Sequence, residues 1–101
     1  MDTKTLIADA KARFSFNASK TYLHDKYTSK LIFADQNGLW RASIEFISAL
    51  SALEDDTLVL LDDYKNPIKV NRSTLLAKAK NVYSKVMEDW YNEFEELKNT
   101  R

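Results

Sequence analysis

The segment VNRSTLLAKAKNVYSKVMEDWYNEFEELK, residues 70–98, sets the architecture that the rest of the chain has to fit. Asn71 is a favourable helix N-cap residue, and Val70 and Leu75 stand at the two positions of a hydrophobic staple around it. Neither Gly nor Pro interrupts residues 72–98, and apolar residues recur there at spacings of three and four: Leu76, Ala79, Tyr83, Val86, Trp90, Phe94 and Leu97. The pattern predicts one long amphipathic helix over residues 72–98.

The length of this helix raises the question of what covers it. About 27 helical residues span about 40 Å, whereas a compact chain of about 100 residues has a radius of gyration of only about 13 Å. The helix therefore either forms the spine of the domain or projects beyond it. If it projects, its apolar far end needs a partner, and aromatic side chains dominate interface energetics. We expect the interaction residues to be Tyr83, Trp90, Tyr91, Phe94 and Leu97.

The only Gly and the only Pro of the chain mark two turns. Asn37-Gly38 lies between apolar runs, which predicts a hairpin with strands near 30–36 and 39–42 and with these two residues at the centre of a type I′ turn. Pro67 suits the first residue of a strand, because its missing N–H matters least there. The sequence therefore predicts a second hairpin that pairs residues 57–62 with residues 67–70.

Helices are predicted for the remaining chain. Residues 3 to about 27 contain no Gly or Pro and have helical spacing, and two alternatives remain: a continuous helix, or a break near residues 14–17 with Asn17 capping a second segment. Ser43 is expected to cap a short helix over residues 44–53. The fold class is therefore α+β, with an N-terminal helix or broken helix, two short hairpins, a short middle helix and the long C-terminal helix in one domain, residues 1–101.

Composition argues against an enzyme. The chain has no Cys, one His (His24) and one Gly, so it has neither a thiolate nucleophile nor the glycines of a phosphate-binding loop. The acidic pairs at residues 55–56 and 62–63 lack the Gly of a calcium loop and are expected to be solvated strand ends. We expect no catalytic residue, no metal site and no cofactor. No apolar run approaches a membrane span or a signal peptide, so we expect a soluble protein in a reducing compartment and no membrane partner.

Charge is segregated although it sums to zero. Residues 54–63 carry only acidic charges, residues 65–85 only basic ones and residues 88–96 only acidic ones. An antiparallel copy of the long helix would align basic with acidic halves, which predicts a homo-oligomer through that helix. The alternative is that the blocks only solvate exposed faces.

Basic residues near aromatic ones suggest a second function class. Such an arrangement binds single-stranded nucleic acid through stacking and phosphate contacts, which would make the protein a small nucleic-acid-binding regulator or recombination accessory. A net charge of zero argues against this alternative. The contact residues would be Lys20, Lys26, Lys30, Trp40 and Arg41.

Four segments in order, KTYLHDKYTSKL (20–31), NGLW (37–40), LLDDYKNPIKVNR (60–72) and WYNEF (90–94), carry a family resemblance. The chain resembles small structural or assembly-type proteins of T4-like tailed phages. The resemblance implies a virion component or assembly accessory in the virion or host cytoplasm, with other protein chains, virion proteins included, as partners. It assigns no functional residue. We therefore expect a non-enzymatic protein–protein interaction module that uses its long C-terminal helix.

Overall fold

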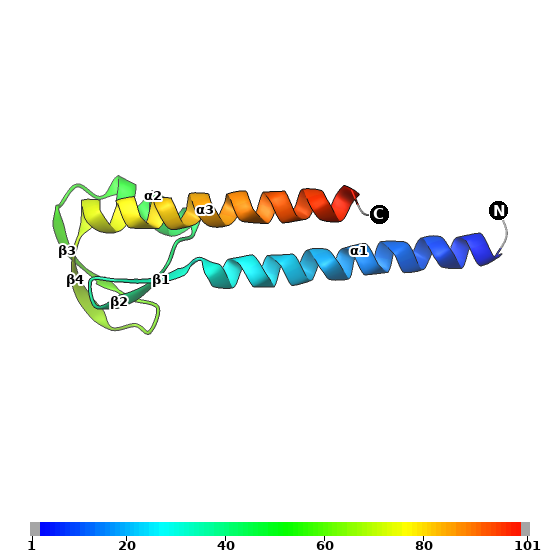
Figure 1. The fold of residues 1–101 in the computed structure, drawn as a ribbon. Coiled ribbons are helices and arrows are strands. Elements are labelled where there is room, and N and C mark those ends of the chain that lie inside the picture. Colours follow the sequence, from blue (N-terminus) through cyan, green and yellow to red (C-terminus); the bar gives the residue numbers. More distant parts are fainter. Residues whose placement is uncertain (1–2, 100–101) are drawn as a thin grey trace.

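A computed structural model describes the backbone of residues 3–99 and the side chains of residues 15–99. The fold is α+β, as predicted, and two long antiparallel helices extend from a head that contains two hairpins and a short helix (Figure 1). The elements are, in order, α1 (Thr3–Lys30), β1 (Ile32–Asp35), β2 (Gly38–Arg41), α2 (Ile44–Ala52), β3 (Thr57–Leu61), β4 (Pro67–Asn71) and α3 (Arg72–Asn99).

The molecule is elongated. Its radius of gyration is 19.3 Å and its extents are 65 × 23 × 21 Å, well beyond the dimensions of a compact chain of this length. The first half of α3 is buried in the head through Leu75 and Ala79, and its second half lies alongside α1 in a two-helix stalk (Figure 1). The long helix is thus a spine at one end and a projection at the other. α1 extends past the C-terminal end of α3 (Figure 1).

The core of the head is made by side chains from several elements. Trp40 from β2, Leu50 from α2, Val70 from β4 and Leu75 from α3 are almost completely buried. The strands form two separate antiparallel pairs, β1 with β2 and β3 with β4. Because side chains alternate along a strand, β3 and β4 direct one apolar set against this core: Leu58, Leu60, Ile68 and Val70.

Both predicted helix caps are confirmed. The Oγ of Ser43 accepts the N–H of Phe46 at 3.1 Å, and the Oδ1 of Asn71 accepts the N–H of Thr74 at 2.9 Å. Val70 and Leu75, the predicted staple pair, are both buried. The side chains of Ser43 and Asn71 start α2 and α3 at the predicted residues, because they satisfy N–H groups that have no partner within the helix.

The N-terminal helix is continuous through residues 14–17. Asn17 is an internal helical residue, and its carbonyl oxygen accepts a hydrogen bond from the Oγ1 of Thr21 at 3.1 Å. The ring of Phe16 packs on the ring of Phe94 from α3, with 6.2 Å between their centroids. Tertiary packing of this kind supplies most of the stability of a helix and outweighs weak local propensity.

The first hairpin forms as predicted, but its turn lies one residue earlier. Gln36 and Asn37 have the positive φ values of 49° and 66°, whereas Gly38 pairs with Asp35 as the first residue of β2 and has no positive φ. Gly38 is needed for space instead. A Cβ at this position would lie 2.7 Å from Cζ2 of Trp40, whose indole N–H is held by the carbonyl of Asp35 at 2.8 Å.

The two hairpins are joined by Asp62, which is the only buried charged side chain among residues 15–99. Its carboxylate accepts the N–H groups of Tyr64 and Asn66 in its own turn, at 3.0 and 2.9 Å, and that of Leu39 in β2, at 3.1 Å. The expectation that residues 62–63 are solvated strand ends is therefore wrong for Asp62. These hydrogen bonds, that of Asn66 foremost, lower the pKa of Asp62.

A second link between the hairpins uses the side chain of Gln36. Its Oε1 accepts the N–H of Asn71 at 2.7 Å, and its Nε2 donates to the carbonyl of the same residue at 3.3 Å. The side-chain amide of Gln36 thus hydrogen-bonds to both the N–H and the C=O of Asn71, as the backbone of a neighbouring strand would.

We expect Gly38→Ala to destabilise the head although the backbone conformation suits alanine. The added Cβ collides with an indole that is 1% exposed and hydrogen-bonded, so the free energy of unfolding falls by about 1–3 kcal/mol. Asn37→Gly is the control, because glycine readily adopts positive φ. It should change the free energy of unfolding by less than about 0.5 kcal/mol. Urea denaturation followed by circular dichroism compares the two, and equal stabilities would contradict the steric argument.

We expect Asp62→Asn to destabilise the protein in a pH-dependent way. A lowered pKa in the folded state means that the ionised carboxylate stabilises the fold at pH values above the unfolded pKa of about 4, and that this stabilisation is lost as the pH falls through the folded-state pKa. The urea midpoint of the variant should therefore lie below that of the parent at neutral pH, and the gap should narrow in acid. Asp63→Asn, at an exposed position, is the control. A gap that is constant with pH would refute the role of the charge.

Candidate interaction surface

The stalk is held by a seam of aromatic and charged side chains between α1 and α3. The ring of Trp90 stacks on Tyr27, with 5.9 Å between centroids and 10° between planes, and meets the edge of His24 at 5.6 Å. Beside it, the Nζ of Lys26 donates to the two carboxylate oxygens of Glu93 at 2.8 and 3.2 Å. Trp90, predicted as an interaction residue, is therefore used largely within the chain.

The ion pair sets the electrostatics of the seam. The hydrogen bond from Lys26 lowers the pKa of Glu93, and the same bond raises the pKa of Lys26. Burial raises the pKa of the neighbouring Tyr27. Both charged groups are therefore ionised at neutral pH, and an acidic residue near the end of α3 has its basic partner on α1.

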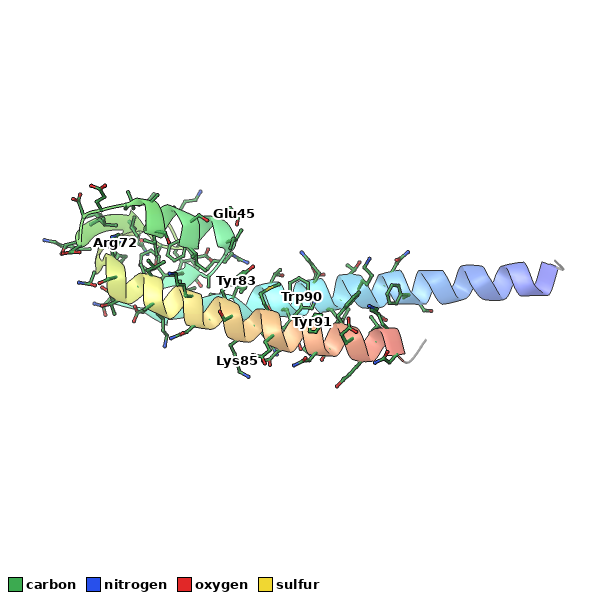
Figure 2. The ribbon with its side chains drawn as sticks, turned by 90° about the horizontal axis from the view of Figure 1, so that it is seen from above. Glu45, Arg72, Tyr83, Lys85, Trp90 and Tyr91 are labelled. Carbon is green, nitrogen blue, oxygen red and sulfur yellow. The ribbon has the colours of Figure 1, made fainter. Side chains whose placement is uncertain are left out.

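The outer face of α3 carries an exposed apolar patch, which we define by Met87, Trp90, Tyr91 and Phe94. These four side chains line a shallow concavity of about 170 Å³. Tyr91 is 64% exposed and Met87 is also exposed, whereas Trp90 and Phe94 form the floor toward α1. Figure 2 shows Trp90 and Tyr91 together on the stalk, away from the head.

The predicted interaction residues are divided between the seam and this patch. Tyr83, Trp90, Phe94 and Leu97 are half-buried and pack against the core cluster, and only Tyr91 is mainly exposed. Met87 was missed by the sequence reasoning. Its position four residues before Tyr91, on the same helix face, is a signal that could have identified it.

A second concavity, of about 330 Å³, lies between the two stalk helices. Its residues on α3 are Glu93, Glu96 and Leu97, and on α1 they include Tyr22, which is 66% exposed. Its lining shares no residue with the apolar patch. Tyr22 is therefore an exposed tyrosine outside the patch, which makes it a useful control.

The residues predicted to contact nucleic acid do not form a stacking platform. Trp40 is 1% exposed and hydrogen-bonded, so it cannot stack on a base, and the prediction is wrong for this residue. Lys26 is engaged with Glu93. The other three basic side chains lie against their own chain: Lys20 over the Phe16 ring at 5.8 Å, Lys30 over the Tyr27 ring at 4.9 Å, and Arg41 with its Nη1 3.5 Å from the Thr28 carbonyl oxygen.

Two further kinds of site are not seen in the part of the chain that the structure describes. No three His, Asp or Glu side chains there converge as metal ligands. No helix there combines the length and the apolar character needed to cross a bilayer.

Comparison with known proteins adds no candidate site, because no family model, curated protein or solved structure matches the chain.

We expect Trp90→Ala and Tyr91→Ser to separate the seam from the patch. Trp90→Ala removes the stacking on Tyr27 and should lower the free energy of unfolding by about 2–3 kcal/mol. Tyr91→Ser removes an exposed ring and should change the free energy of unfolding by less than about 0.5 kcal/mol. Thermal and urea denaturation followed by circular dichroism measure both. A neutral Trp90→Ala would mean that the seam does not hold the stalk together.

Proposed function

We propose that the protein is a non-enzymatic protein–protein interaction module that docks through the outer face of α3. The observation that carries the proposal is the apolar patch of Met87, Trp90, Tyr91 and Phe94, which stays open to solvent in a chain with 30% charged residues. Exposed clusters of aromatic and methionine side chains around a concavity are typical of protein interfaces. Tyr91 and Met87 are the expected anchors, because their burial on docking does not disturb the seam.

The charges around the patch favour a second copy of this chain as the partner. Lys80, Ser84, Met87, Tyr91 and Glu95 follow one another at spacings of four, three, four and four, so they share a helix face. An antiparallel copy of α3, centred between residues 87 and 88, would place Lys80 opposite Glu95 and Ser84 opposite Tyr91. The two-fold symmetry of such a dimer repeats each pair twice. A parallel copy would instead oppose like charges.

The resemblance to small proteins of T4-like tailed phages supports a context for this module. In that context the protein is a virion component or assembly accessory, in the virion or the host cytoplasm, and virion proteins are further partners. Self-association through α3 is compatible with assembly work, because virions are built from repeated copies of their chains.

We expect sedimentation velocity to show a reversible monomer–dimer equilibrium between low and high micromolar concentration. Met87→Glu buries a charge and Tyr91→Ser removes an anchor, so each should weaken the dimer by about tenfold or more. Tyr22→Ser changes an equally exposed tyrosine outside the patch and should leave the equilibrium unchanged. Circular dichroism confirms that each variant stays folded.

Charge reversal tests the antiparallel orientation. Lys80→Glu and Glu95→Lys should each weaken the dimer, and the double variant should recover it, because the symmetric pairs are then restored in the opposite sense. A parent protein that sediments as a monomer at every concentration would overturn self-association. A double variant no better than the singles would overturn the antiparallel arrangement.

A further inference from the structure

The strand β3 has an edge with no partner. Hydrogen bonds from Asp62 N to Asn66 O at 3.0 Å and from Arg72 N to Asp56 O at 2.7 Å bracket its ladder with β4. Because N–H and C=O groups alternate between the two sides of an antiparallel strand, those of Thr57, Val59 and Leu61 point away from β4. Within the described residues β4 is the only strand that pairs with β3, and no backbone hydrogen bond joins these three residues to another element. Just past the strand, the next N–H on that side, that of Asp63, donates to the carbonyl of Leu39 in β2 at 2.6 Å, so the edge is open from Thr57 to Leu61 only.

The other edge of this hairpin is protected in the ways that natural sheets use. β4 starts with Pro67, which has no N–H, and continues with Lys69, whose charge opposes edge pairing. The outward backbone groups of Asn71 are occupied by the side chain of Gln36. β3 has none of these features. It contains no proline and no charge, and the outward backbone groups of Thr57, Val59 and Leu61 are open.

The outer face of β3 carries two exposed apolar side chains, beside Thr57 and opposite Lys69 and Pro67 of β4. Val59 and Leu61 are 62% and 64% exposed, and the exposed Pro67 pairs with Leu61 across the hairpin. The outer face of a two-stranded sheet is normally polar, since its inner face alone packs on the core. An extended segment added beside β3 would hydrogen-bond to its edge and cover these two side chains.

The charges at both ends of β3 decide what can occupy the edge. Asp55 and Asp56 precede the strand and Asp63 follows it, all three are exposed, and residues 54–63 include no basic residue. A second copy that paired antiparallel about Val59 would place Asp55 opposite Asp63 and Asp56 opposite Asp62. Like charges at both ends oppose that pairing, and Asp62 is held in place by three hydrogen bonds. The edge therefore rejects a second copy.

We propose that β3 accepts an extended segment of another protein, apolar and β-branched in its middle and carrying Lys or Arg at both ends. The segment adds as a strand beside β3, with main-chain hydrogen bonds to Thr57, Val59 and Leu61. Its apolar side chains cover Val59 and Leu61, and its basic ends lie near the acidic residues on either side of the strand. This site is separate from the patch on α3 and does not depend on it.

The test uses the full chain and a synthetic peptide, Lys-Lys-Val-Thr-Val-Ile-Val-Lys-Lys. Amide hydrogen exchange by NMR should show fast exchange at Thr57, Val59 and Leu61 in the free protein, because their N–H groups have no protein acceptor. With saturating peptide these three amides should slow by tenfold or more. The amides of Leu58 and Leu60, which face β4, should be slow in both states. Affinity should fall as salt is added.

Matched peptides and variants separate the parts of the proposal. A peptide with Glu in place of the four Lys residues should bind at least tenfold more weakly, and one with Pro at its centre should not protect the three amides. Val59→Lys in the protein should abolish protection, whereas Tyr91→Ser should retain it whether or not the protein dimerises through α3.

Three results would overturn the proposal. One is an absence of binding at millimolar peptide. Another is equal binding of the Glu peptide, which would remove the charge argument. The third is concentration-dependent protection of the three amides in the protein alone, which would show that a second copy covers the edge after all.

Discussion

Neither hairpin of the head can hold its shape alone, because an isolated two-stranded sheet is at best marginally stable in water. Each is stabilised by what it packs on and by the other. Trp40 and Val70 bury their side chains in one core, and Asp62 and Gln36 bond across from one hairpin to the backbone of the other. The head is therefore a single unit of two small sheets. Its position, between the end of α1 and the start of α3, determines how the two long helices leave it.

The stalk explains a charge order that would otherwise disfavour α3. Basic residues lead this helix and acidic residues trail, against the preference of the helix dipole. Glu93 is paired with Lys26 of α1, and Lys30 also lowers its pKa. The acidic end of α3 thus has basic residues of α1 for neighbours. Part of the zero net charge is a cancellation within the chain, between helices that lie side by side.

Local signals predicted the elements, and long-range contacts supplied what was missing. The caps at Ser43 and Asn71 and the proline at the start of β4 act within a few residues, so they can be read from sequence. The burial of Asp62 and the need for a glycine beside Trp40 depend on groups brought together only by the fold. The exposed residues of α3 could not be identified from local sequence signals for the same reason. An apolar stripe on residues 72–98 was evident, but only the position of α1 shows that Trp90 faces inward and Tyr91 outward.

The two proposed surfaces differ in the partner that their charges allow. In the proposed antiparallel dimer the face of α3 would oppose Lys80 to Glu95, whereas the acidic residues around β3 would oppose one another in a second copy. β3 belongs to the head, and an antiparallel dimer along α3 would place the two heads at opposite ends of the assembly (Figure 1). With both proposals combined, such a dimer would present two strand-accepting edges, one at each end. Its geometry would be that of a bivalent connector, in which the stalk would join two copies of the chain and each head would bind its own extended segment of another protein.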